Sequence, residues 1–75
     1  MTSIKMDLKG LNCPLPVLRA NKKMKELIAG DILEIDVTDP AAPKDFETYS
    51  ETTGNALISS IESDGVFTIS LEKSA

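Results

Sequence analysis

The spacing of the apolar residues changes abruptly near the start of the chain. Ile4, Met6 and Leu8 alternate with polar residues, which is typical of a half-buried strand. Shortly afterwards the apolar residues recur at the three- and four-residue spacing of an amphipathic helix. The change falls within Leu8–Pro16, a segment that holds the only cysteine of the chain, Cys13. A strand and a helix must therefore lie next to each other, with this cysteine in the turn between them.

The first helix is expected to follow Cys13 and to end at Gly30, because glycine suits the left-handed conformation that terminates many helices. Its apolar stripe consists of Val17, Ala20, Met24, Leu27 and Ile28, with Leu18 beside it. Most basic residues of the segment lie off this stripe. Asn21 lies near the stripe, and the pattern identifies no partner for it.

The later elements follow the same two kinds of spacing. A second strand is predicted over Ile32–Val37, and Asp39 and Pro40 predict a capped second helix that ends at Gly54. The stripe of this helix consists of Ala42, Phe46, Tyr49 and Thr53. The last two strands, Leu57–Glu62 and Val66–Glu72, are separated by Ser63-Asp64-Gly65, which is a hairpin signal.

The predicted order of elements is β-α-β-α-β-β, and it indicates an α+β fold of two layers. We expect a mixed four-stranded sheet with both helices on one face and solvent on the other. A chain of 75 residues leaves room for one hydrophobic core, so residues 1–75 are expected to form a single domain.

Composition excludes several classes of protein. A net charge of −4 argues against general nucleic-acid binding, although six of the eight basic residues fall within the first 25 residues. No apolar run is long enough for a membrane span or a signal peptide, and one cysteine cannot form an intramolecular disulfide. We therefore expect a cytoplasmic protein without membrane association.

Residue types also limit the chemistry. The chain has no histidine, which excludes Ser-His and Cys-His catalysis and imidazole metal sites, and it has no second cysteine for a redox pair. It also lacks a glycine-rich phosphate loop, and its carboxylate pairs are typical of solvated strand faces. No cofactor and no metal are expected, and Cys13 is left as the candidate catalytic residue.

A free cysteine is more often a small buried hydrophobic residue than a nucleophile. The context of Cys13 favours the nucleophile. A residue before proline avoids the helical conformation, so Cys13 is predicted at the helix N-cap, with Pro14 and Pro16 as positioning residues in the first turn and Gly10 as the turn former.

At that position the sulfur would face the free N–H groups of Leu15 and Val17 and the positive end of the helix dipole, with Lys9 and Arg19 nearby. We therefore expect a lowered thiol pKa and an exposed thiolate. A single thiol without a general base can take sulfur from a persulfide, hold it as Cys–S–SH and pass it on.

The segment Asp7-Leu8-Lys9-Gly10-Leu11-Asn12-Cys13-Pro14-Leu15-Pro16 resembles the Gly-Leu-x-Cys-Pro-x-Pro signature of the TusA-like (SirA-like) sulfur-carrier proteins. The resemblance continues through Gly30-Asp31, Asp39-Pro40, Asp45, Gly54 and the terminal hairpin. It implies a β-α-β-α-β-β sandwich and a persulfide on Cys13. It also implies a sulfurtransferase-type carrier, whose status as an enzyme the resemblance leaves open.

By the same resemblance, the partners are a cysteine desulfurase or rhodanese-type donor and an acceptor in tRNA thiolation, cofactor biosynthesis or sulfur oxidation. Leu15 stands where the tRNA-thiolation members typically carry Glu, which favours the sulfur-trafficking or sulfur-oxidation kind. Candidate docking residues are Lys9, Arg19, Lys22 and Lys23, although a solvated helix face explains them equally well. The alternative is a non-catalytic regulatory or protein-interaction module that docks through this basic helix. An RNA-binding module is a weaker third option.

Overall fold

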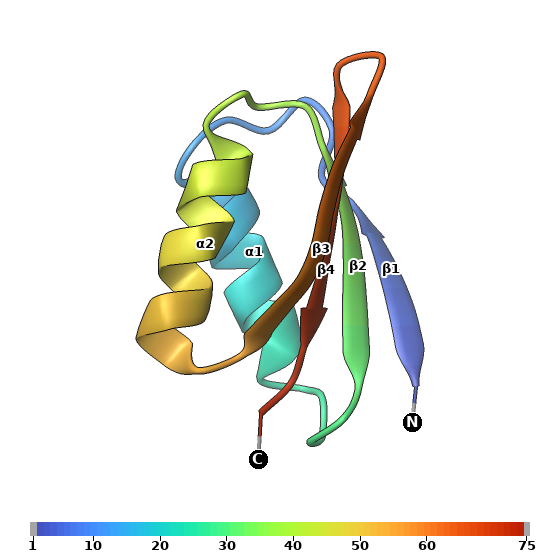
Figure 1. Ribbon diagram of the computed structural model, residues 1–75, viewed down its shortest axis with the longest axis vertical. Coiled ribbons are helices and arrows are strands. Elements are labelled where there is room, and N and C mark those ends of the chain that lie inside the picture. Colours follow the sequence, from blue (N-terminus) through green and yellow to red (C-terminus); the bar gives the residue numbers. More distant parts are fainter. Residues whose placement is uncertain (1, 75) are drawn as a thin grey trace.

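The computed structural model describes residues 2–74, which form four strands and two helices. In chain order these are β1 (Ser3–Asp7), α1 (Leu15–Met24), β2 (Ile32–Val37), α2 (Ala42–Thr53), β3 (Ala56–Ser63) and β4 (Val66–Glu72). The sheet order is β1-β2-β4-β3, with β1 parallel to β2 and β4 antiparallel to both of its neighbours. Both helices cover the same face of the sheet (Figure 1). The predicted mixed sheet and two-layer fold are confirmed.

The core lies between this face and the helices. β2 contributes Leu33, Ile35 and Val37, all fully buried, and the first two pair in register with Leu71 and Ile69 of β4. The helices complete the core with Ala20, Met24, Ala42, Phe46 and Tyr49. Burial of each large side chain contributes about 1.5–3 kcal/mol, so β2 and β4 hold the two layers together.

The hairpin between β3 and β4 is tighter than the sequence suggested, because Ser63 belongs to β3. Only Asp64 and Gly65 form the turn, with φ values of 52° and 82°. Left-handed conformations at both positions define the type I′ turn, whose twist matches that of antiparallel strands.

The prediction that α1 runs to Gly30 is wrong, because the helix ends at Met24. The buried carboxylate of Asp31 accepts a hydrogen bond from the backbone N–H of Ile28 at 3.1 Å, and the carbonyl of Ile28 accepts one from the N–H of Asp31 at 3.0 Å. These bonds hold residues 28–31 in a turn instead of a helix. Leu27 still packs in the core, whereas Ile28 is 72% exposed.

The second helix begins later than Asp39-Pro40 predicted, at Ala42, with Pro43 in its first turn. Asp39 lies before the helix, where its carboxylate accepts a hydrogen bond from the N–H of Ala41 at 3.0 Å. The predicted end is confirmed, since Gly54 adopts a φ of 82°. Thr53 was expected in the apolar stripe but is exposed.

A polar network explains the position of Asn21. Its side-chain oxygen accepts a hydrogen bond from the hydroxyl of Tyr49 at 3.1 Å, and that hydroxyl accepts one from the amide of Asn55 at 3.2 Å. The side-chain oxygen of Asn55, a buried residue, accepts hydrogen bonds from the backbone N–H and the hydroxyl of Ser74. The network links α1, α2 and the segment after β4, and it satisfies polar atoms that burial would otherwise penalise.

We expect Asn55→Ala to lower the free energy of unfolding by about 1–3 kcal/mol, because it removes the buried partner of Tyr49 and Ser74. Urea denaturation followed by circular dichroism measures this change. Asn12→Ala at an exposed position serves as the control and should change the stability by less than about 0.5 kcal/mol. Equal effects of the two substitutions would contradict a structural role for the network.

Candidate functional site

The loop that carries Cys13 crosses the end of the sheet opposite the chain termini (Figure 1). The first part of the loop is held to the end of β2. There the backbone N–H of Gly10 donates a hydrogen bond to the hydroxyl of Thr38 at 3.0 Å. Gly10 has a φ of 86°, a left-handed conformation that favours glycine over any residue with a Cβ. The structure thus places Gly10 at the turn, as the sequence suggested.

Asp39 ties the loop to the second helix. One oxygen of its carboxylate accepts a hydrogen bond from the backbone N–H of Cys13 at 2.6 Å, and the other accepts from Ala41 at the start of α2. The carboxylate therefore bridges two segments that are 26 residues apart in the chain. Charge-assisted hydrogen bonds of this kind are stronger than bonds between neutral groups.

Cys13 does not occupy the N-cap of α1. Pro14 does, with φ −97° and ψ 12°, and the helix starts at Leu15. The N–H of Leu15 donates a hydrogen bond to the carbonyl of Asn12 at 2.9 Å, and Pro16 has no N–H to offer. Few free donors of the first turn remain to face the sulfur, so the expected contribution of the helix dipole is small.

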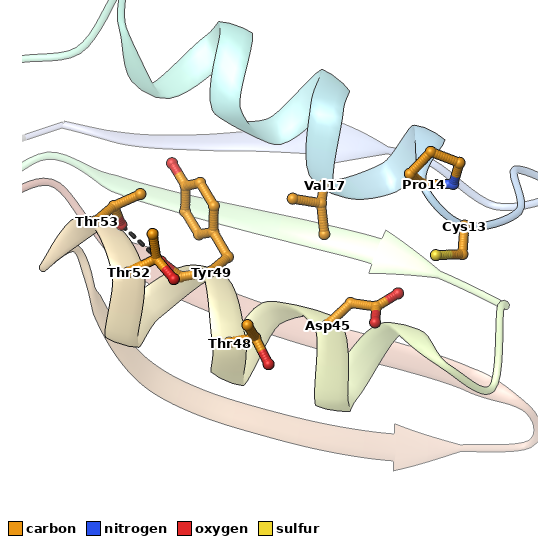
Figure 2. A pocket seen from close by; sticks show the side chains of 8 residues that line it. All are labelled: Cys13, Pro14, Val17, Asp45, Thr48, Tyr49, Thr52 and Thr53. Atoms are coloured by element: carbon orange, nitrogen blue, oxygen red, sulfur yellow. Dashed lines mark hydrogen bonds between the residues drawn. The ribbon is translucent and has the colours of Figure 1, made fainter.

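The thiol lies at the rim of an open groove of about 350 Å³ between the two helices (Figure 2). Pro14 and Val17 form the α1 side. The α2 side consists of Asp45, Thr48, Tyr49, Thr52 and Thr53, whose spacing places them on one face of a helix. The chain therefore presents an exposed thiol beside a groove large enough for a small group.

The carboxylate of Asp45 lies beside the thiol of Cys13 and raises the pKa of that thiol. This carboxylate and the sulfur of Cys13 point toward one another in Figure 2. The hydrogen-bond acceptor that Asp45 presents to the thiol proton is the main cause that raises the pKa of Cys13, followed by desolvation and by the negative charges of Asp45 and Asp39. The prediction of a lowered pKa is therefore wrong, because nearby carboxylates outweigh the helix end.

The four candidate docking residues differ in whether an acidic residue neutralises them. The ammonium group of Lys9 lies 3.0 Å from the carboxylate of Asp7, and the backbone N–H of Lys9 is the main cause that holds the pKa of Asp7 below its ordinary value. Lys23 pairs with Glu26 at 3.3 Å. Within residues 2–74, Arg19 and Lys22 have no acidic partner within ion-pair distance.

Between residues 2 and 74, no three His, Cys, Asp or Glu side chains gather as a metal ion would require. Neither α1 nor α2 is long and apolar enough to cross a membrane. The sequence analysis noted Asp39 and Asp45 but assigned neither to Cys13. An acidic residue at the start of a helix is common for dipole reasons alone, so its spacing carries no sign of a thiol partner.

We expect Asp39→Ala to accelerate hydrogen exchange at the Cys13 amide and to lower the free energy of unfolding by about 1 kcal/mol, because the amide loses its acceptor. Amide exchange by nuclear magnetic resonance measures the first effect. Glu47→Ala, an exposed substitution on α2, is the control. An unchanged exchange rate at Cys13 would refute the bridging role of Asp39.

We expect Asp45→Asn to lower the pKa of Cys13, because it removes the charged acceptor that stabilises the neutral thiol. The pH profile of alkylation by iodoacetamide should move to lower pH, with about tenfold more thiolate at neutral pH for each unit by which the pKa falls. Glu47→Gln removes the same charge away from the thiol and should leave the profile in place. A profile that moves to higher pH in Asp45→Asn would contradict this account.

Comparison with known proteins identifies the family of the chain. Residues 4–73 match the family described as Sulfurtransferase TusA. The chain is 46% identical over 69 residues to a candidate sulfur carrier protein of Neisseria meningitidis, covering 92% of this chain and 93% of that protein. It is 44% identical over 69 residues to the sulfur carrier protein TusA of Allochromatium vinosum, covering 92% and 91%.

A crystal structure of a SirA-like protein from Desulfitobacterium hafniense has the same fold, with a TM-score of 0.84 and 28% identity. The superposition covers 96% of this chain and 99% of that protein. The match in sequence and the match in fold both extend over nearly the whole chain. The chain therefore belongs to the TusA family of sulfur carriers.

Proposed function

We propose that Cys13 carries sulfur as a persulfide, accepting it from a donor protein and passing it to an acceptor protein. The observation that carries this proposal is the position of the thiol. It is the only thiol of a chain from a sulfur-carrier family, and it is free and exposed at the rim of an open groove. The donor is of the cysteine desulfurase or rhodanese type.

The transfer balances without an oxidant or a cofactor. The Cys13 sulfur attacks the outer sulfur of the donor persulfide, and the bond between the two donor sulfurs breaks. The Cys13 thiol proton passes to the sulfur that leaves on the donor. The result is one donor thiol and Cys13–S–SH. In the second step a nucleophile of the acceptor attacks the outer sulfur, and Cys13 leaves as a thiolate that regains a proton.

Asp45 and Asp39 favour the protonated form of the Cys13 thiol while the carrier is empty. Because the raised pKa keeps the thiol protonated, the free carrier is less reactive toward small oxidants and alkylating agents than a thiolate would be. Asp45 acts here as a hydrogen-bond acceptor for the proton that the thiol retains. The carrier then becomes nucleophilic when a donor changes the surroundings of the two carboxylates.

The positioning roles remain part of the proposal. Gly10 turns the loop, the exposed Pro14 caps α1, and the buried Pro16 anchors its first turn. On the outer face of α1, Arg19 and Lys22 are exposed, and Leu18 beside them is 56% exposed. This mixed basic and apolar face favours a protein partner near Cys13, and it is also what the alternative interaction module would use. Lys9 and Lys23 are less available to a partner, because they are paired with Asp7 and Glu26.

The compartment follows from the same chemistry. A carrier that works through a free thiol requires surroundings that keep the thiol reduced, so we place its activity in the cytoplasm. The acceptor belongs to tRNA thiolation, cofactor biosynthesis or sulfur oxidation.

We expect incubation with a cysteine desulfurase and cysteine to add the mass of one sulfur atom to the protein, removable by a reducing agent. Intact-mass spectrometry measures the gain, and Cys13→Ser should abolish it. A gain that survives in Cys13→Ser would contradict the proposal. If Cys13→Ser instead preserves function in a deletion strain while Arg19→Glu with Lys22→Glu abolishes it, the interaction module is the better account.

A further inference from the structure

Most hydroxyl groups that line the groove beside Cys13 already donate a hydrogen bond within the protein. The hydroxyl of Tyr49 donates to Asn21. The hydroxyls of Thr48 and Thr53 donate to backbone carbonyls of α2, at 3.2 Å and 2.8 Å. Of the lining hydroxyls, only that of Thr52 has no partner among residues 2–74. The hydroxyl oxygens of Tyr49 and Thr53 also accept hydrogen bonds from Asn55, so the groove offers an incoming donor chiefly the carboxylate of Asp45 and the hydroxyl oxygens of Thr48 and Thr52.

The charge of the groove points the same way. Asp45 is the only charged residue in its lining, and none of the lining residues is basic. A carboxylate or sulfonate entering here would meet like charge and would find few donors, whereas an ammonium or guanidinium group would find a counter-ion and several acceptors. The lining thus favours a cation.

The shape of the groove fits one long side chain. Pro14, Val17 and the ring of Tyr49 give it apolar walls, while Asp45 lies at the end beside Cys13 (Figure 2). The stems of lysine and arginine pack along apolar surface and leave the charged group at a polar end. About 350 Å³ is at the lower end of small-ligand sites, and the groove is open at the surface, so a side chain projecting from another protein can enter it.

We propose that this groove receives a lysine or arginine side chain of the protein that delivers sulfur to Cys13, with Asp45 as its counter-ion. The inference rests on the proposed function and names the chemistry by which that site selects its donor. The bound cation would offset the charge of Asp45 beside the thiol. Docking would thereby prepare the sulfur for attack only when a donor of the right charge is present.

The test uses three short peptides with lysine, alanine or glutamate directly before a cysteine that carries 5-thio-2-nitrobenzoate in a mixed disulfide. The Cys13 thiolate attacks the peptide sulfur, the Cys13–peptide disulfide forms, and the coloured nitrothiobenzoate leaves as a thiolate. Its absorbance gives the rate. Comparing rates as ratios at one pH cancels the thiolate fraction, so a change in the pKa of Cys13 does not affect the result.

At low salt, the native protein should react about fivefold faster with the lysine peptide than with the alanine peptide, and the glutamate peptide should be slower by a similar factor. Salt should reduce both ratios. Asp45→Asn should bring them close to one, and Glu47→Gln, the control on an exposed part of α2, should keep them. Equal rates in the native protein, unchanged ratios in Asp45→Asn, or an equal loss in Glu47→Gln would each overturn the inference.

These outcomes are independent of persulfide formation. A protein that gains sulfur from the desulfurase but shows no charge preference retains the proposed function and loses the inference. A protein that prefers the lysine peptide but never gains sulfur loses the proposed function and keeps a cation-selective thiol site.

Discussion

The bridge that Asp39 makes is the contact on which the site depends. Its two carboxylate oxygens bind the backbone of Cys13 and of Ala41, so the thiol loop and the start of α2 have a fixed relationship. Asp45 lies in the first turn of that same helix, where its carboxylate faces the thiol. Without the bridge, the loop would be held to α2 only indirectly, through the Tyr49–Asn21 hydrogen bond between the two helices and through packing on the sheet. The position of the nucleophile and its electrostatic surroundings thus have a common origin.

The N-terminus of α1 and two nearby carboxylates have opposite effects on the pKa of the Cys13 thiol. A helix N-terminus contributes through its unsatisfied N–H groups, and in α1 prolines and a local hydrogen bond have removed most of them. Asp45 and Asp39 bear full negative charges close by, and the raised pKa of the thiol reflects their dominance. A protonated thiol is less reactive toward electrophiles than a thiolate would be.

The sequence predicted the fold well because alternation and helical spacing report which residues face the core. Leu33, Ile35, Ile69 and Leu71 occupy alternate positions of the predicted strands Ile32–Val37 and Val66–Glu72, and all four are fully buried. The ends of the helices were harder to predict. Gly30 does adopt a left-handed conformation, but α1 ends at Met24, ahead of the turn over residues 28–31 that the Asp31 side chain holds. Contacts between distant residues, such as Asp39 with Cys13, leave no periodic trace and could not be predicted.

Side-chain hydrogen bonds hold both ends of the described chain, and their position affects how the domain can be fused to other proteins. The carboxylate of Asp31 accepts a hydrogen bond from the N–H of Thr2, and Asn55 holds Ser74. Both of these chain ends lie at the end of the sandwich remote from the Cys13 loop (Figure 1). A fluorescent protein or affinity tag attached beyond Thr2 or Ser74 would therefore start at the end of the sandwich away from the Cys13 thiol. Ser74 lies next to the Thr53 end of the groove, so an attachment there would border that end while it leaves the thiol open.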